Sequence, residues 1–189
     1  MVSFGDDSRG QSGSSASMQR PIAGGPHPTA MQNAIQASET PATMLYLDDL
    51  HVGDRFTSRT HLIEEARIKE FAAEFDPQPF HLDEAAASAS LFKGLAASGW
   101  HTAAIAMRLL VTSGLPLAEG IIGLGGEIAW PKPTRPGDLL HVESEIVSIT
   151  PSRSKPHQGV VAVRSTMFNQ HQEAVYVFTA KILVSRRAD

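Results

Sequence analysis

The sequence predicts a single α+β domain in which a long antiparallel sheet curls around one apolar helix. Residues 99–112 (GWHTAAIAMRLLVT) are apolar around almost the whole helical circumference, which is typical of a helix wrapped by other structure. Residues 121–184 then contain four strand-like segments joined by short loops. Consecutive strands of this kind form an antiparallel sheet, and its apolar face needs a helix to cover it.

The composition is that of a globular domain and excludes several classes of function. The chain has 189 residues, 42% of them hydrophobic, and a formal net charge of -4, which suits one domain with a real core. This charge provides no basic footprint for nucleic acid or for an anionic membrane surface. The chain has no cysteine, so disulfides, thiolate nucleophiles and cysteine metal sites are excluded. No apolar run has the about 20 residues of a bilayer span and no signal peptide is evident, so the sequence predicts a soluble cytoplasmic protein without membrane contact.

The beginning of the chain differs in composition from the rest. Residues 1–43 are rich in Ser, Gly, Gln and Pro and lack apolar periodicity, so they are predicted to be disordered, with residues 44–189 forming the domain. Met44 stands directly before the first apolar run, and we expect the natural start of the protein to lie near it. N-terminal sequencing of the native protein tests this hypothesis, and a start at Met1 contradicts it.

Short elements precede the apolar helix. Residues 55–61 (RFTSRTH) have the β-branched and aromatic residues of a short strand. A helix is predicted over residues 63–75, because its apolar side chains share one face; these are Ile68, Phe71, Ala72 and Phe75. Pro77 ends this helix, since the residue before a proline is pushed out of the α region. Further on, polar caps mark two helix starts, Asp83 before residues 84–90 and Ser98 before the apolar helix.

After the apolar helix, which Gly114 and Pro116 end, the chain changes to the period of a strand. Strands are predicted over residues 121–130, 139–149, 160–169 and 174–184. The glycines of the first of these predict a β-bulge or a close approach to another backbone. Such a sheet leaves its edges uncovered, and a second copy of the chain is the common solution, so we expect a homodimer.

A candidate acid/base pair lies directly before the apolar helix. Asp76 and His81 stand on a loop stiffened by Pro77 and Pro79, and the helix then starts at Ser98–Gly99. A histidine side chain ordinarily titrates near neutral pH, and a carboxylate can orient a water molecule. The alternative interpretation is a turn aspartate beside a surface histidine. The flanking prolines and the helix start favour the catalytic interpretation.

These residues resemble a known family. The segment Phe75–His81 (FDPQPFH), followed by Ser98–Gly99, is similar to the hydratase-2 signature of the MaoC-like dehydratases, the R-specific enoyl-CoA hydratases. The run Gly123–Asp138 also resembles the strand and loop that follow the family's central helix. The resemblance covers Leu45 to the C-terminus. It implies the hot-dog fold, a curved antiparallel sheet wrapped around a central helix, usually as a dimer.

The resemblance also implies a chemical role for each matching residue. Asp76 and His81 would hold one water molecule and move its proton during syn hydration of a trans-2-enoyl-CoA, or during the reverse dehydration. Gly99 would offer its backbone N–H to the thioester carbonyl oxygen, a role that suits a free amide at a helix start. The implied partner is an acyl-CoA thioester of fatty acid metabolism, and no metal or redox cofactor is required.

Four further residues are expected to contact the substrate: Gln78, Pro79, Ser98 and Trp100. Gln78 stands where the family has Asn, and it either fixes the loop or touches the ligand. Ser98 stands where the family often has His, and we expect a helix cap rather than a nucleophile, since no G-x-S-x-G elbow is present. Trp100 is expected to pack as well as to lie near the substrate. Met107 replaces a serine found in some hydratases.

Two rival functions remain open at this point. A hot-dog acyl-CoA thioesterase would also use a carboxylate and a helix N-terminus, and a non-catalytic module would bind acyl-CoA or an acyl carrier without turnover. The histidines have no metal-ligand spacing, so no metal site is expected, and His101 is expected to be a hydrogen-bonded core residue. Basic residues could either meet CoA phosphates or be solvated; they are Lys132, Arg135, Arg153, Lys155 and Arg164.

Overall fold

The computed structural model describes residues 43–188. The segment predicted to be disordered, residues 1–43, lies outside the described residues except for Thr43, and the natural start near Met44 stays a prediction. No helix in the described range is long and apolar enough to cross a membrane.

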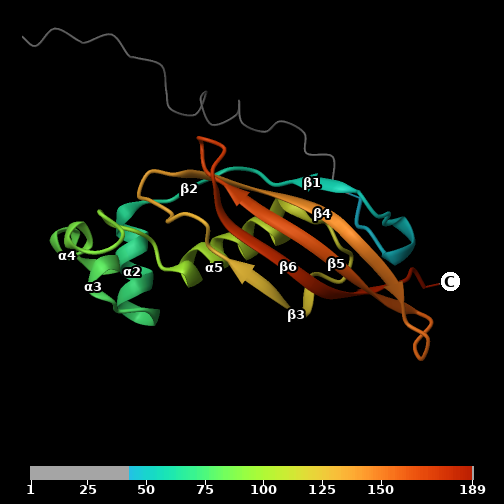
Figure 1. Ribbon diagram of the computed structural model, residues 1–189. Helices are drawn as coiled ribbons and strands as arrows, with labels where there is room; N and C mark the ends of the chain where they lie inside the picture. Colours follow the sequence, from blue (N-terminus) through green and yellow to red (C-terminus); the bar gives the residue numbers. More distant parts are fainter. Residues whose placement is uncertain (1–42, 189) are drawn as a thin grey trace, which may run out of the picture. The chain divides into compact units, whose positions relative to one another are not determined.

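One antiparallel sheet forms the main layer of the domain (Figure 1). Its strands follow the order β1-β4-β5-β6-β3, and β2 pairs with β4 beside this path. The strands are β1 (Arg55–Thr57), β2 (His61–Leu62), β3 (Ile122–Ala129), β4 (Leu139–Pro151), β5 (Gln158–Phe168) and β6 (Ala174–Ser185). A register shift between Gly123 and Gly125 of β3 confirms the predicted bulge.

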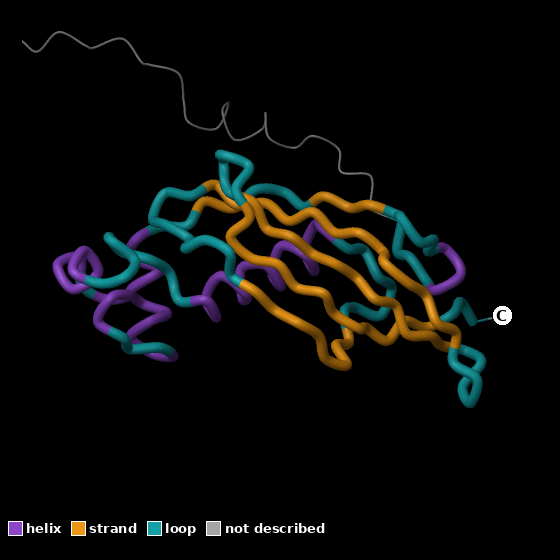
Figure 2. The backbone as a smooth tube through the Cα atoms, viewed as in Figure 1, coloured by secondary structure: helices purple, strands orange, loops and turns teal. Residues whose placement is uncertain are grey.

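The helices occupy two places relative to the sheet. In Figure 2, the helix that follows residue 98 lies along one face of the strands, and the helices between residues 65 and 89 gather beyond one end. The helices are α2 (Glu65–Phe75), α3 (Pro79–Leu82), α4 (Glu84–Ala89) and the central α5 (Gly99–Leu109), with a 3-10 turn η1 (Leu47–Asp49) and a π-helical turn η2 (Leu110–Gly114) that continues α5. A curved antiparallel sheet around a central helix was expected, and the structure confirms it.

Two boundaries differ from the predictions because side-chain and loop contacts override local propensity. The strand predicted over residues 55–61 divides at Ser58, whose hydroxyl accepts the Val142 N–H at 2.9 Å where a strand carbonyl would otherwise pair. The helix predicted from residue 63 begins at Glu65. Ile63 cannot join it, because its N–H and C=O both pair with the loop at Asp138 and Gly137.

Three other predicted helix boundaries are confirmed. Asp76 leaves the helical region at φ -152° and ψ 67°, as a residue before proline must. The Asp83 side chain accepts the Ala86 N–H, and the Ser98 side chain accepts the Trp100 N–H, so both are N-caps.

The expectation that α5 is wrapped on every side is wrong for the single chain. Its core face is buried, through Thr102, Ile105, Ala106 and Leu109. On the opposite side, Trp100 and Met107 of α5 and Val111 of η2 are 62%, 42% and 58% exposed. These side chains, together with the exposed Ile122 and Leu124 of the edge strand β3, form an apolar surface that we call the α5–β3 surface.

Candidate active site

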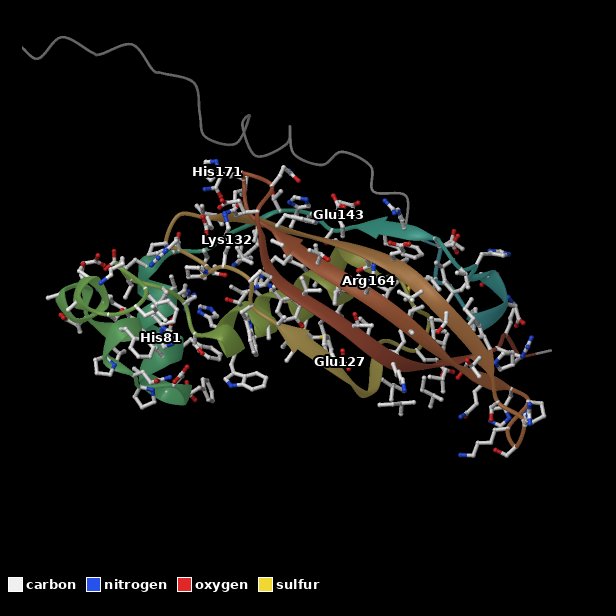
Figure 3. The ribbon with its side chains drawn as sticks, in the orientation of Figure 1. His81, Glu127, Lys132, Glu143, Arg164 and His171 are labelled. Carbon is white, nitrogen blue, oxygen red and sulfur yellow. The ribbon has the colours of Figure 1, made fainter. Side chains whose placement is uncertain are left out.

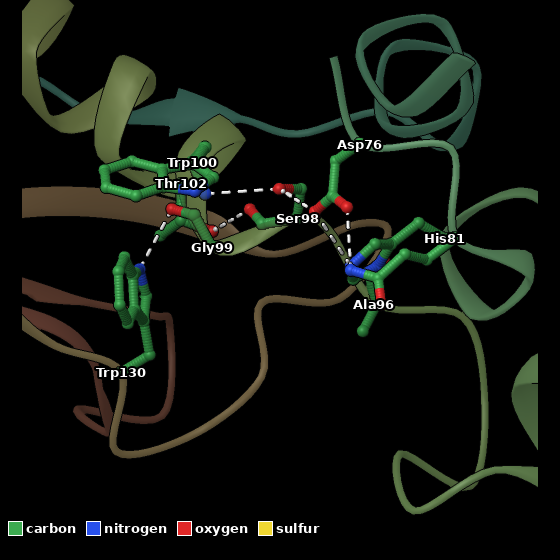
Figure 4. Close-up of polar contacts among 9 residues, drawn as sticks. Asp76, His81, Ala96, Ser98, Gly99, Trp100, Thr102 and Trp130 are labelled. Carbon is green, nitrogen blue, oxygen red and sulfur yellow. Dashed lines mark hydrogen bonds and ion pairs between the residues drawn. The ribbon is translucent and has the colours of Figure 1, made fainter. Parts of the chain in front are cut away.

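The loop between α2 and α3 brings the side chains of Asp76 and His81 close together. Pro77 ends α2, and Pro79 occupies the first turn of α3, where a missing N–H costs nothing. The single turn of α3 then directs His81 inward, so that this side chain is only 4% exposed. The His81 Nε2 atom lies 3.4 Å from the Asp76 Oδ2 atom. The two residues of the predicted pair are therefore adjacent (Figure 4).

A backbone carbonyl defines the proton position on His81. The Nδ1 atom lies 2.7 Å from the Ala96 carbonyl oxygen. A carbonyl oxygen can only accept a hydrogen bond, so Nδ1 must carry the hydrogen and donate it. In the neutral ring Nε2 is then unprotonated, and it is this nitrogen that faces Asp76. The geometry leaves a proton acceptor beside a carboxylate.

Asp76 is held as a carboxylate by two side-chain donors. The Ser98 hydroxyl donates to Oδ2 at 2.7 Å, and the Gln78 amide donates to Oδ1 at 2.7 Å. Burial by itself raises the pKa of Asp76, but the hydrogen bonds from Ser98 and Gln78 and the charge of His81 outweigh it and hold the pKa below its ordinary value. Asp76 can therefore orient water while remaining ionised near neutral pH.

The start of α5 supplies a free amide. Ser98 caps the helix through Trp100, and no hydrogen-bond acceptor for the Gly99 N–H is found within residues 43–188. The indole of Trp130 packs against Gly99 and donates to its carbonyl oxygen at 2.9 Å. A Cβ atom at Gly99 would lie 2.9 Å from the Trp130 Cε2 atom, so this close approach requires glycine. The free N–H also lies at the positive end of the helix dipole.

These groups line one pocket of about 440 Å³. Asp76, His81 and Gly99 form part of its wall. Four aromatic side chains also line it, namely Phe80, Phe92, Trp100 and Trp130. A concave, mostly apolar pocket with a few convergent polar groups is typical of a small-molecule site.

The four predicted substrate contacts take different places. Gln78 and Trp100 line the pocket. Ser98 is fully buried beneath it and reaches the site through Asp76. Pro79 lies outside the lining and serves the start of α3. Trp100 makes an edge contact with the Trp130 ring, with the centroids 5.7 Å apart, and it is too exposed for a core residue.

The loop after β3 contributes groups that the sequence analysis missed. Trp130 and Thr134 line the pocket, and the Thr134 hydroxyl is hydrogen-bonded to Thr102 of α5 at 3.0 Å. A tryptophan before a proline-rich loop carries no local signal of this position. Among the basic candidates, Lys132 lines the pocket and pairs with Glu173.

Two other basic candidates, Arg135 and Arg164, do not line the pocket. Arg164 lies over the sheet, away from the helices that carry His81 (Figure 3). Arg135 binds backbone carbonyls rather than remaining solvated.

The expectation that His101 is a hydrogen-bonded core residue is wrong. Its Nδ1 atom is buried and has no hydrogen-bond partner within the described residues. The ring instead stacks on Phe71, with the centroids 4.6 Å apart and the planes 4° from parallel. Burial, and then the charge of His61, lowers the pKa of His101. A neutral ring suits this aromatic contact. No cluster of three or more His, Cys, Asp or Glu residues that could hold a metal occurs in the described range.

Comparison with known proteins assigns the chain to a family. A family model described as the MaoC-like domain matches residues 49–168. The chain belongs to the MaoC-like domain family. This match includes Asp76, His81 and the start of α5.

Solved structures of similar proteins have the same fold. The MaoC-like dehydratase from Rhodospirillum rubrum is 64% identical, with 77% of this chain and 99% of that chain covered and a TM-score of 0.76. The R-hydratase PhaJ1 from Pseudomonas aeruginosa is 30% identical, covers 76% and 88% of the two chains, and has a TM-score of 0.61. The hot-dog fold expected from the resemblance is thus confirmed.

A curated relative also spans the MaoC-like region. The uncharacterized protein YdeM of Bacillus subtilis is 31% identical over 141 residues, which cover 74% of this chain and 99% of that protein.

Proposed function

We propose that this chain is a hydro-lyase that adds water to, or removes it from, an acyl thioester through Asp76 and His81. Membership of the MaoC-like family, together with likeness to an R-hydratase, supports the hydratase/dehydratase class. One observation carries the proposal. The His81 Nε2 atom, which is unprotonated in the neutral ring, lies 3.4 Å from the Asp76 carboxylate, in a pocket that also contains the free Gly99 N–H.

The geometry suggests the following hydration sequence. A water molecule between the two side chains gives a proton to His81 Nε2, and its oxygen adds to C3 of the enoyl group. The electrons move to the thioester carbonyl oxygen, where the Gly99 N–H stabilises the developing enolate. The His81–Asp76 pair then returns a proton to C2 from the same side. The Ala96 carbonyl holds the imidazolium by accepting from Nδ1–H throughout.

The proposed substrate is a trans-2-enoyl-CoA of fatty acid metabolism, with the R-specific course of the named hydratases. The aromatic wall of Phe92, Trp100 and Trp130 suits an acyl chain. No cofactor takes part in the proposed reaction.

We also propose that the active form is a homodimer. The α5–β3 surface is apolar and exposed in the single chain, and within residues 43–188 β3 has only β6 as a sheet neighbour. An edge strand beside an apolar helix face can be covered by an identical copy, which extends the sheet and buries both helices.

Loss of enoyl absorbance measures hydration directly. Purified protein is mixed with trans-2-enoyl-CoAs of different chain lengths, and a thiol reagent monitors free CoA in parallel. We expect the enoyl signal to fall without thiol release. Thiol release would instead indicate a thioesterase, and acyl-CoA binding without either signal would indicate a binding module.

Two variants test the assignment of the pair. Asp76→Asn and His81→Ala should each lower kcat by roughly 10²- to 10⁴-fold, the contribution typical of a general acid or base. Circular dichroism checks that both variants remain folded. Unchanged turnover in both would rule out this active site.

A further inference from the structure

The Arg135 guanidinium is committed to the backbone of the loop that precedes α5. It donates to the Gly94 carbonyl at 2.6 Å, to the Leu95 carbonyl at 3.0 Å, and to the Phe92 carbonyl. Arginine presents its N–H groups in a rigid planar fork, so a single side chain can bind several acceptors at once. The positions of these carbonyls depend on Arg135.

The loop itself has a conformation that needs such support. Lys93 has a φ of 56° and Gly94 a φ of 146°, both in the left-handed region. A lysine rarely adopts a positive φ, because its Cβ is crowded there. A loop with this backbone persists when surrounding contacts hold it. Arg135 provides three of those contacts from a distant part of the chain.

Ala96, which follows Leu95 in this loop, is the residue that orients His81. The Ala96 carbonyl accepts the His81 Nδ1–H at 2.7 Å. On its other side, the Ala97 N–H donates to the Thr134 carbonyl at 2.9 Å. Ala96 is therefore anchored on both sides by Thr134 and Arg135, which are consecutive in sequence.

Arg135 is itself fixed by a buried carboxylate. Its backbone N–H donates to Asp138 Oδ2 at 2.7 Å, and Asp138 is only 5% exposed. Gln170 donates to the other Asp138 oxygen at 3.2 Å. The guanidinium therefore extends from a rigid turn rather than from a mobile loop.

We propose that Arg135 is a positioning residue for His81. By holding the loop of residues 92–95, it keeps the Ala96 carbonyl where it receives the Nδ1–H, so that the unprotonated Nε2 is directed at Asp76. The inference rests on the proposed function only for the catalytic role of His81, since the tautomer can be observed without turnover. Neither the fold nor the acid/base pair alone assigns any role to Arg135.

The test compares Arg135→Met and Arg135→Lys with the wild-type chain. Ring ¹⁵N chemical shifts, assigned to His81 by their loss in His81→Gln, report which nitrogen carries the hydrogen. We expect Nδ1–H in the wild type and a mixture of both tautomers in Arg135→Met. Its kcat should fall at least about tenfold with KM little changed, because a displaced base loses its alignment. Arg135→Lys should be intermediate, since an ammonium group lacks the planar fork.

Val161→Ala is the matched control, because it weakens the core at a fully buried position on β5. It should lower stability without changing the tautomer or kcat. A folded Arg135→Met that keeps the wild-type Nδ1–H tautomer would overturn the proposal. Should Arg135→Met fail to fold, the same readouts on Arg135→Lys decide, and an unchanged tautomer there has the same meaning. Absence of turnover in the wild type would contradict the proposed reaction, while the tautomer shift would still test the positioning role.

Discussion

Ser98 links the candidate acid/base pair, Asp76 and His81, to the central helix α5. Its hydroxyl donates to Asp76 Oδ2 at 2.7 Å, and its oxygen accepts the Trp100 N–H at 3.2 Å. Ser98 is fully buried, so both bonds form away from water. One side chain thus caps α5 and holds the carboxylate in place beside His81.

Ser98→Ala should lower kcat/KM by about 10- to 100-fold, because a hydrogen bond to a charged group is worth about 1.5–3 kcal/mol. Loss of the cap should also reduce the free energy of unfolding by about 1 kcal/mol. Enoyl-CoA turnover and urea unfolding measure the two effects. Asp83→Ala is the matched control, since it removes the N-cap of α4 and should lower stability without a comparable loss of activity. Full activity in Ser98→Ala would contradict the role given to the Ser98–Asp76 bond.

The lowered pKa of Asp76 predicts a specific pH dependence of stability. Its ordinary value is 3.8, and in the folded chain the hydrogen bonds from Ser98 and Gln78 and the charge of His81 overcome the opposing effect of burial. A carboxyl whose pKa is depressed by folding contributes stability that is complete above its unfolded value and is lost as the pH falls through its folded value.

Asp76→Asn removes this titration. The stability advantage of the wild type over Asp76→Asn should therefore be present above the ordinary pKa of 3.8 and should shrink as the pH falls below about 4. Urea unfolding of both proteins across this range gives the difference, in which the other carboxyl groups cancel. A difference that grows toward acid would contradict the lowered pKa.

The contact between Gly99 and Trp130 predicts a steric coupling. Because a Cβ at Gly99 would lie 2.9 Å from the Trp130 ring, Gly99→Ala should cost about 1–3 kcal/mol of unfolding free energy, the usual effect of overpacking. In a Trp130→Leu background the ring is absent, so the same substitution should cost less than half as much. A double-mutant cycle by urea unfolding measures this coupling. An equal loss of unfolding free energy in both backgrounds would show that the Trp130 ring is not the reason for glycine at position 99.

The α5–β3 surface predicts the effect of a charge on assembly. Leu124→Lys, at a side chain that is 56% exposed on β3, should convert the proposed dimer to a monomer, because burying an unpaired ammonium is costly. Sedimentation velocity gives the oligomeric state. Leu91→Lys is the control, since Leu91 is 93% exposed and lies outside this surface. A dimer that survives Leu124→Lys would place the interface elsewhere.

Local signals predicted much of this protein from its sequence. Strand alternation located β4, β5 and β6 closely, because a strand facing a core on one side must alternate. Prolines and polar caps located the end of α2 and the starts of α4 and α5, since these residues act on the adjacent backbone. The spacing of Asp76 and His81 around two prolines was enough to single them out as a candidate pair.

Only the tertiary structure decided which groups complete the site. The Ser98–Asp76 bond joins residues 22 apart in sequence, and the Trp130–Gly99 bond joins residues 31 apart. Arg135 reaches the loop before α5 across about 40 residues of chain, with separations of 40–43. Such contacts depend on how α5 packs against the loop after β3, and a local sequence pattern does not predict that packing. The sequence by itself therefore determined the elements and the candidate pair, while the folded chain determined the tautomer of His81 and the residues that hold it.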